Sequence, residues 1–271
     1  MLNLLKADFY KLKKSKAFWI LNAVALAMCI IAVIASKISF DSFIGNSELP
    51  DKAQAQLSAM AHQASGVWAL TTQLPMIPLL VGIFVAIFLT SEFTHGTMKN
   101  ILSKGAVRIK VYASKFIVCG FVSIVMLIVS WVALAVLGSI VWGFDPQGIA
   151  SVSKLVVYLL LMSLLTVSYT AVFTFIAMSI RSNGGTVAVN VVISVMMSVL
   201  IGWINLIIGY NVDLTKYWLD GPINTLANAN SSAILLSYDS EFIVRAVIVA
   251  IAWGVAAIAG GMVLFQKRDV K

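Results

Sequence analysis

Residues 116–141 read FIVCGFVSIVMLIVSWVALAVLGSIV and contain no charged side chain. A helix needs about 20 apolar residues to cross the roughly 30 Å of hydrocarbon in a bilayer, so this stretch is long enough to span one. Five further long apolar runs occur, at residues 17–35, 67–90, 155–180, 187–208 and 242–265. The sequence therefore predicts an all-α polytopic membrane protein with six transmembrane helices.

The composition of the 271 residues agrees, since 61% are hydrophobic and 11% are charged. These values lie far from those of soluble proteins. Little chain remains outside the six runs, so we expect a single transmembrane domain over residues 1–271 and no second globular domain. In a soluble protein the net charge of +8 would suggest a nucleic-acid partner. Here the basic residues are sorted by side, and we expect no nucleic acid.

The lysines and arginines gather in alternate loops. Segments 1–16, 91–115, 181–186 and 266–271 hold 14 of the 19. By the positive-inside rule these segments are cytoplasmic, as are both termini. Eight acids fall in the opposite loops: Asp41, Glu48, Asp51, Asp145, Asp213, Asp220, Asp239 and Glu241. We expect a multi-pass protein of the cell membrane, most consistent with a bacterial plasma membrane.

The first 16 residues combine lysines with an apolar stripe. The run that follows is too long for a signal-peptide core and no clear cleavage site follows it, so we expect an uncleaved first span. Leu2, Leu5, Phe9 and Leu12 recur at helical spacing, which predicts an amphipathic helix in the cytoplasmic interface. This helix is either a basic flank attracted by anionic lipid or an element with a specific mechanical role.

Signals of catalysis or metal binding are missing from the sequence. Cys29 and Cys119 both fall inside predicted spans, and His62 and His95 fall on opposite sides of the membrane. There is no GxxxxGK[ST] loop, so we expect no nucleotide site, no catalytic residue and no cofactor in this chain. None of the runs has an ionisable residue near its centre, which argues against an ion-coupled transporter. We expect another subunit to supply the energy for transport.

The inner loop at residues 91–115 predicts a short surface helix. Gly96 allows a sharp turn, Thr97 is placed to cap the helix, and Gly105 is placed to end it in a left-handed conformation. Between them, Met98, Ile101 and Leu102 form one apolar face. We expect a helix of one to two turns on the cytoplasmic surface.

This loop resembles the first inner loop of the membrane subunits of ATP-binding-cassette exporters of the second type (ABC-2 permeases). Those loops carry Glu-x-x-x-Gly-Thr-x-Lys/Arg-x-x-Leu, followed by Arg and by Lys before the third span. The matching residues here are Glu92, Gly96, Thr97, Lys99, Leu102, Arg108 and Lys115. Many members have proline where this chain has Gly105 and Ala106, and this difference resembles the branch of bacitracin and lantibiotic resistance permeases.

The resemblance implies a coupling role for the short helix. In that family the helix rests on a separate ABC ATPase, which binds ATP and Mg²⁺, and passes its movement to the spans. We therefore expect residues 96–105 to form the coupling element, with Glu92 as a charged hinge at the end of span two. The alternative is that Glu92 only pairs with a nearby lysine or arginine.

Two polar stripes follow helical spacing in spans four and five. The members are Ser163, Thr166, Thr170 and Thr174 in one, and Asn190, Ser194, Ser198, Gly202, Asn205 and Gly209 in the other. Small and polar residues commonly pack membrane helices. We favour packing or a dimer seam over a translocation path for most of these residues. Ala250, Gly254, Ala257 and Gly261 in the last span are interpreted as packing residues.

Two outer segments are longer than simple turns. Residues 36–66 include a predicted surface helix at 51–57, and residues 211–241 contain short apolar pieces at 217–219 and 233–236. These pieces are too short to cross the bilayer, so we expect interfacial or re-entrant half-helices. Either an outer gate or a simple cap fits this pattern.

The sequence is interpreted as a permease subunit. We expect it to pair with itself or a sister permease, to bind two ATPase subunits, and to move an amphiphilic compound outward. A cationic antimicrobial peptide or lipid-linked antibiotic is the favoured substrate class. The alternatives are a non-transporting immunity or sensor protein for such a compound and, third, a secondary transporter.

Overall fold

The computed structural model describes residues 1–46, 76–142, 152–208, 213–228 and 240–267. Every regular element in these ranges is helical. In chain order they are α1 (Leu2–Lys14), α2 (Lys16–Asn46), α4 (Ile77–Thr94), α5 (Thr97–Ser103), α6 (Arg108–Trp142), α7 (Val152–Ile180), α8 (Asn183–Ile208), η3 (Leu214–Tyr217), α9 (Asp220–Asn228) and α10 (Ser240–Lys267).

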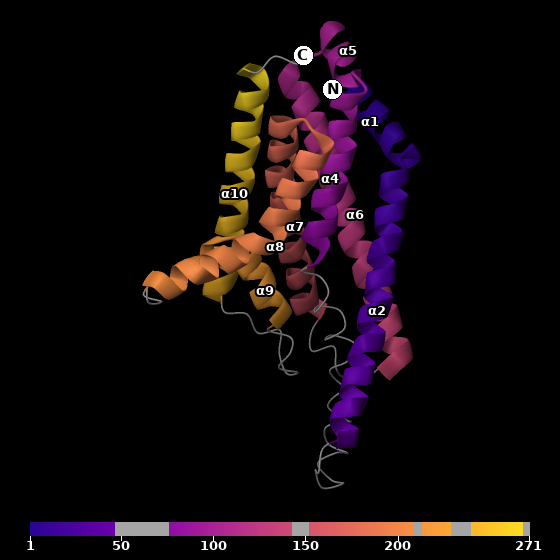
Figure 1. Cartoon of the computed structure of the whole chain (residues 1–271), viewed down its shortest axis with the longest axis vertical. Helices are drawn as coiled ribbons and strands as arrows, with labels where there is room; N and C mark the ends of the chain where they lie inside the picture. The colour runs from indigo at the N-terminus through magenta and orange to yellow at the C-terminus, as the bar shows by residue number, and fades with distance from the viewer. Residues whose placement is uncertain (47–75, 143–151, 209–212, 229–239, 268–271) are drawn as a thin grey trace.

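Six of these helices are long and apolar enough to cross a membrane: α2, α4, α6, α7, α8 and α10. The predicted all-α, six-span architecture is confirmed. Helices α4 and α7 form the centre of the bundle. In the most apolar 18-residue stretch of each helix, 67% of α4 and 61% of α7 is buried inside the protein. Helix α7 packs against α10, α4 and α6, and α4 packs against α8 as well. Figure 1 shows α2 at one edge of the bundle and α10 at the other.

One end of the bundle gathers the elements expected to be cytoplasmic. Helices α1 and α5 lie there together with the C-terminal end of α10 (Figure 1). Arg108, the first residue of α6, donates hydrogen bonds to the Gln266 carbonyl at 2.9 Å and the Phe265 carbonyl at 3.4 Å. The opposite end holds η3 and α9. This arrangement positions the amphipathic N-terminal helix at the same end of the bundle as the short helix of the inner loop.

Several helices are longer than the apolar runs that predicted them. Helix α2 continues to Asn46 and α6 begins at Arg108, so the predicted loops starting at residue 36 and ending at residue 115 are wrong at those ends. Helix α8 begins at Asn183, four residues before its predicted span. Residues 67–75 of the second predicted span lie outside the described residues. So do the predicted surface helix at 51–57 and the apolar piece at 233–236.

Small residues bring α10 close to its neighbours. A Cβ at Gly254 would lie 3.3 Å from the Ser168 hydroxyl oxygen, and one at Gly261 would collide with the Tyr112 hydroxyl. Ser168 also donates a hydrogen bond to the Ala250 carbonyl at 2.8 Å. The packing interpretation of the small residues in the last span is confirmed at these positions.

Candidate functional site

The inner loop forms a short helix between two left-handed glycines. Gly96 has φ +66° and precedes α5, and Gly105 has φ +83° and follows it. The turn and the left-handed end predicted from the sequence are therefore both confirmed. Thr97 is the first helical residue and its side chain makes no cap, so the prediction that it caps the helix is wrong. Only glycine adopts this backbone region without strain, which fixes the direction of α5 relative to α4 and α6.

The predicted apolar face of α5 points into the bundle. Met98 is fully buried, and Ile101 and Leu102 are half-buried against the core. The opposite face is exposed, with Lys99 and Lys104 on it. Helix α5 therefore has its apolar side held by the spans and its basic side free to meet another molecule.

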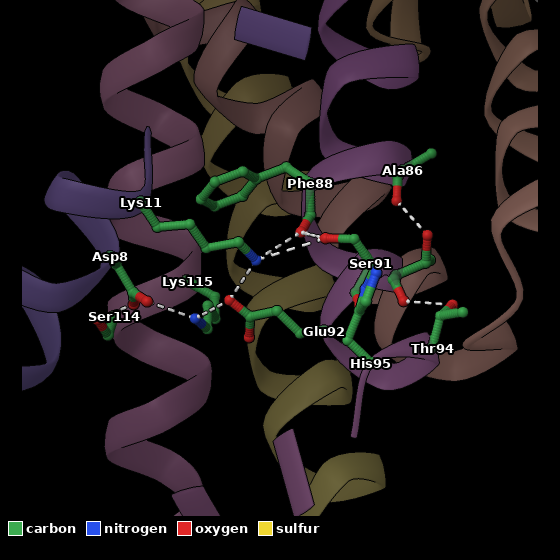
Figure 2. Close-up of polar contacts among 11 residues, drawn as sticks. Asp8, Lys11, Ala86, Phe88, Ser91, Glu92, Thr94, His95, Ser114 and Lys115 are labelled. Carbon is green, nitrogen blue, oxygen red and sulfur yellow. Dashed lines mark hydrogen bonds and ion pairs between the residues drawn. The ribbon is translucent and has the colours of Figure 1, made fainter. Parts of the chain in front are cut away.

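A cluster of charged side chains lies beside α5, at the inner ends of three helices. Glu92, on α4, is 2% exposed, and Lys115, on α6, is 1% exposed. Their charged atoms, Glu92 Oε1 and Lys115 Nζ, lie 2.6 Å apart. Lys115 also forms an ion pair with Asp8 of α1, which is itself buried. Figure 2 shows the lysine lying between the two carboxylates.

Two more side chains complete this ion-pair cluster, which we define as Asp8, Lys11, Glu92, Ser114 and Lys115. Lys11 Nζ lies 2.8 Å from Glu92 Oε1, and the Ser114 hydroxyl donates to Asp8 Oδ2 at 2.7 Å. The Lys11 side chain is 38% exposed, so one side of the cluster reaches the surface of the bundle.

The cluster balances two acids against two lysines. Removing an isolated charge from water costs several kcal/mol, and opposite partners at close range offset this cost. The lysine ammonium of Lys11 also lies 4.7 Å from the Phe88 ring centroid, which adds a cation–π contact. The arrangement joins α1, α4 and α6 at the base of α5, so these helices are tied to one another where the short helix leaves the bundle.

The sequence predicted only part of this cluster. Glu92 pairs with lysines, as expected from the alternative in which it pairs with a nearby lysine or arginine. Asp8, from outside the loop, supplies a second carboxylate to Lys115. Asp8 and Lys11 were missed. One signal was present: Asp8 is three residues after Leu5 and four before Leu12, so an acid falls on the apolar face of α1.

The other predicted coupling residues lie apart from the cluster. Arg108 binds the end of α10 as described above. On the second inner turn, Arg181 has φ +60°, and its guanidinium lies 5.5 Å from the Phe93 ring centroid, next to Glu92 in the chain.

The three threonines of the polar stripe of α7 lie inside the bundle, whereas Ser163 is only half-buried. Thr166, Thr170 and Thr174 are at most 1% exposed. Thr166 and Thr170 donate to carbonyls one turn earlier on their own helix, those of Met162 and of Thr166, at 2.6 and 2.9 Å. In this conformation none of the three presents its side chain to a second copy or to a solute.

The stripe of α8 divides into an inner and an outer half. In the inner half, Asn190 donates to the Gly82 carbonyl of α4 at 2.8 Å, and Ser194 donates to its own helix. In the outer half, Ser198 donates to Asp220, and Asn205 donates to Asp213 Oδ1 at 3.2 Å. The outer residues therefore hold η3 and α9 against the spans.

Comparisons with known proteins agree with this architecture. The family profile for ABC-2 family transporter proteins matches residues 4–197, which include α1, the ion-pair cluster and α5. A search of curated proteins finds no match to the chain. The profile covers well over half of the sequence, and the chain belongs to the ABC-2 family of transporter membrane proteins.

Proposed function

We propose that this transmembrane ABC transporter subunit exports an amphiphilic compound, with ATP hydrolysed on a separate ABC ATPase that contacts α5. ATP and Mg²⁺ bind to that partner in this proposal. The permease pairs with a second copy or a sister permease, so that two ATPases serve two permeases. Family membership supports the ATPase partner. The pairing, the direction of transport and the class of substrate belong to the proposal.

The coupling role rests on one observation. Buried ion pairs hold α1, α4 and α6 together at the point where α5 leaves the bundle. Two residues join α5 to α4, and four residues join it to α6. The side chain of Met98 is fully buried, so α5 cannot slide over the surface without moving core residues. A push on the exposed basic face is therefore passed to two spans at once.

The ion-pair cluster extends this movement to α1. Glu92 lies four residues before Gly96, and it contacts lysines of both α6 and α1. A displacement of the α4 end therefore pulls on Lys11 and Lys115 together. In this mechanism α1 acts as a mechanical element as well as a basic flank, and the cluster keeps α1, α4 and α6 moving as one body.

The apolar character of the spans favours an amphiphilic compound as the substrate. Their central regions carry no charged side chain in the sequence, and an apolar compound can enter from the bilayer. The resemblance to exporters supports outward movement. A cationic antimicrobial peptide or a lipid-linked antibiotic remains the favoured class, because either combines an apolar body with a polar head.

The experiment is reconstitution with the co-expressed ATPase and the variant Gly96→Val. A β-branched residue at φ +66° is strained, which misdirects α5 without creating a collision, since no atom lies within 4 Å of a Cβ there. We expect an assembled complex that hydrolyses ATP and has lost transport. Gly184→Val, at an exposed glycine that has no positive φ and no atom within 4 Å of a Cβ, is the matched control and should transport normally.

Two outcomes contradict the proposal. Normal transport by Gly96→Val would show that the direction of α5 is irrelevant to coupling. Absence of a stoichiometric ATPase after purification in mild detergent would remove the exporter function and favour a non-transporting immunity or sensor protein.

A further inference from the structure

A second polar centre lies at the outer end of the bundle, around Asp220. This aspartate begins α9, and its carboxylate accepts hydrogen bonds from three donors. Tyr169 of α7 donates to Oδ1, Ser198 of α8 donates to Oδ2, and the Trp218 indole nitrogen donates to Oδ2 at 3.1 Å. Three segments that are far apart in the sequence meet at this one side chain.

All three donors are neutral, so they orient the carboxylate without cancelling its charge. Two other outer acids, Asp213 and Glu241, differ. Asp213 Oδ2 lies 3.5 Å from Lys216 Nζ, and Glu241 lies 3.7 Å from an Arg245 nitrogen. Within the described ranges no lysine or arginine forms an ion pair with Asp220. A half-buried carboxylate held this way attracts a positively charged group, because the local dielectric is lower than that of water.

An open cavity of about 300 Å³ is lined by residues that donate to this carboxylate, and Asp220 lies directly behind the wall that they form. Two of the three donors, Ser198 and Trp218, line it directly. The remaining lining residues are Ile201, Thr215, Gly221, Asn224 and Thr225. A Cβ at Gly221 would collide with the Thr215 carbonyl, so glycine is required for η3 and α9 to meet at the cavity wall.

The chemistry of the lining fits an ammonium group. Hydroxyl and amide oxygens of Thr215, Asn224 and Thr225 can accept hydrogen bonds from N–H donors. Trp218 adds an aromatic residue to the wall. The volume is at the lower end for small-molecule sites, enough for a head group and a few carbons but not for a large solute.

A metal ion fits this site less well. Calcium and magnesium need about six oxygen ligands, often with several carboxylates. No group of three or more histidine, cysteine, aspartate or glutamate side chains that could hold a metal occurs in the part of the chain described here. By contrast, Ile204 and Ile208 of α8 are exposed and lie three and seven residues after the cavity-lining Ile201, on the same face of the helix, and they offer an apolar surface for an alkyl tail.

We propose that the cavity beside Asp220 binds the ammonium head of a cationic amphiphile while its tail lies along α8. The identification of this amphiphile with the transported compound rests on the proposed function, whereas the binding itself does not. An ethanolamine lipid head group carries the same ammonium chemistry. The site is therefore defined by the ammonium, and the two sources are separated by experiment.

The test uses the full chain in phosphatidylglycerol nanodiscs, without the ATPase, and photo-crosslinking by a diazirine-bearing alkylamine. The matching alcohol probe has the same chain and no charge. Mass spectrometry then maps the labelled peptides. We expect at least several-fold more labelling of residues 198–225 by the amine than by the alcohol. Because no ATP is involved, this result is independent of whether coupling through α5 is correct.

Three variants give the assignment its controls. Asp220→Asn should abolish the preference for the amine, and Asp213→Asn should keep it because Asp213 already pairs with Lys216. Thr225→Trp fills the cavity while leaving the three donors of Asp220 in place, and it should reduce labelling by both probes. If Asp220→Asn fails to fold, Thr225→Trp still tests whether the probes bind in this cavity.

Equal labelling by amine and alcohol in the unmodified chain would overturn the proposal, as would a preserved amine preference in folded Asp220→Asn. Unreduced labelling in Thr225→Trp would overturn the assignment to this cavity. Adding phosphatidylethanolamine distinguishes the sources of the ammonium. A loss of amine labelling identifies the lipid head group as an occupant, and unchanged labelling identifies a free amphiphile.

Discussion

Replacing Lys115 with methionine should destabilise the protein far more than the same change at Lys11. Lys115 is 1% exposed and pairs with both Asp8 and Glu92. Removing one partner of a buried ion pair costs about 3–5 kcal/mol, because the remaining charge stays buried. Lys11 is 38% exposed and its loss leaves Glu92 paired with Lys115, so the cost should be closer to 1 kcal/mol.

A compensating variant makes this prediction sharper. In Lys115→Met, two carboxylates share the single charge of Lys11. Adding Asp8→Asn restores the balance, because Glu92 keeps Lys11 at 2.8 Å. The double variant should therefore recover a substantial part of the loss, on the order of 1–3 kcal/mol, although Glu92 and the residue at position 8 have each lost the contact with Lys115.

The assay is equilibrium unfolding in mixed detergent micelles, followed by circular dichroism and by tryptophan fluorescence. The free energy of unfolding should fall in the order unmodified chain, Lys11→Met, double variant, Lys115→Met. Equal losses for the two single lysine variants, or a double variant no more stable than Lys115→Met alone, would refute the view that the cluster is a buried, charge-balanced unit.

Three further predictions concern packing and topology. Gly82→Ala should destabilise the protein by about 1 kcal/mol in the same assay, because the new Cβ would lie 3.3 Å from the Asn190 Cβ. Gly120→Ala, where no atom lies within 4 Å of the new Cβ, should be neutral or should stabilise the protein by about 0.5–1 kcal/mol. Equal effects of the two variants would contradict the close approach of α4 and α8 at Gly82. Asn190→Ala should cost about 1 kcal/mol by removing the bond to the Gly82 carbonyl, and no loss would show that this bond is unimportant. Cysteines at Ser103 and Thr225, both exposed, should react with an impermeant reagent from opposite sides of the membrane, and reaction of the Ser103 cysteine on intact cells would overturn the topology.

The spans could be predicted because hydrophobicity is a property of consecutive residues. The uncharged stretch at 116–141 marks a membrane helix whatever surrounds it. The ends of helices were harder to place. Helix α6 (Arg108–Trp142) begins eight residues before the apolar run. It includes Lys115, a buried lysine whose charge is balanced by carboxylates from two other helices. A count of apolar residues treats such a lysine as the edge of a loop.

The ion-pair cluster and the Asp220 centre depend on contacts over long sequence distances. Asp8 and Lys115 are separated by 107 residues, and Tyr169 and Asp220 by 51. Local patterns indicate which face of a helix is buried, but they do not state which helix covers it. The turn at Gly96 and the left-handed end at Gly105 were predicted correctly, because the glycines that form them are visible locally.

Site-specific photo-crosslinking from α5 tests most directly whether this face meets an ATPase. A photoreactive amino acid in place of Lys99, which is exposed on α5, would be activated in cells that co-express the ATPase. The same substitution at Lys216, exposed at the opposite end of the bundle, is the control. We predict a covalent product with the ATPase from position 99 and none from position 216. No product from position 99 in an assembled complex, or an equal product from both positions, would contradict coupling through α5.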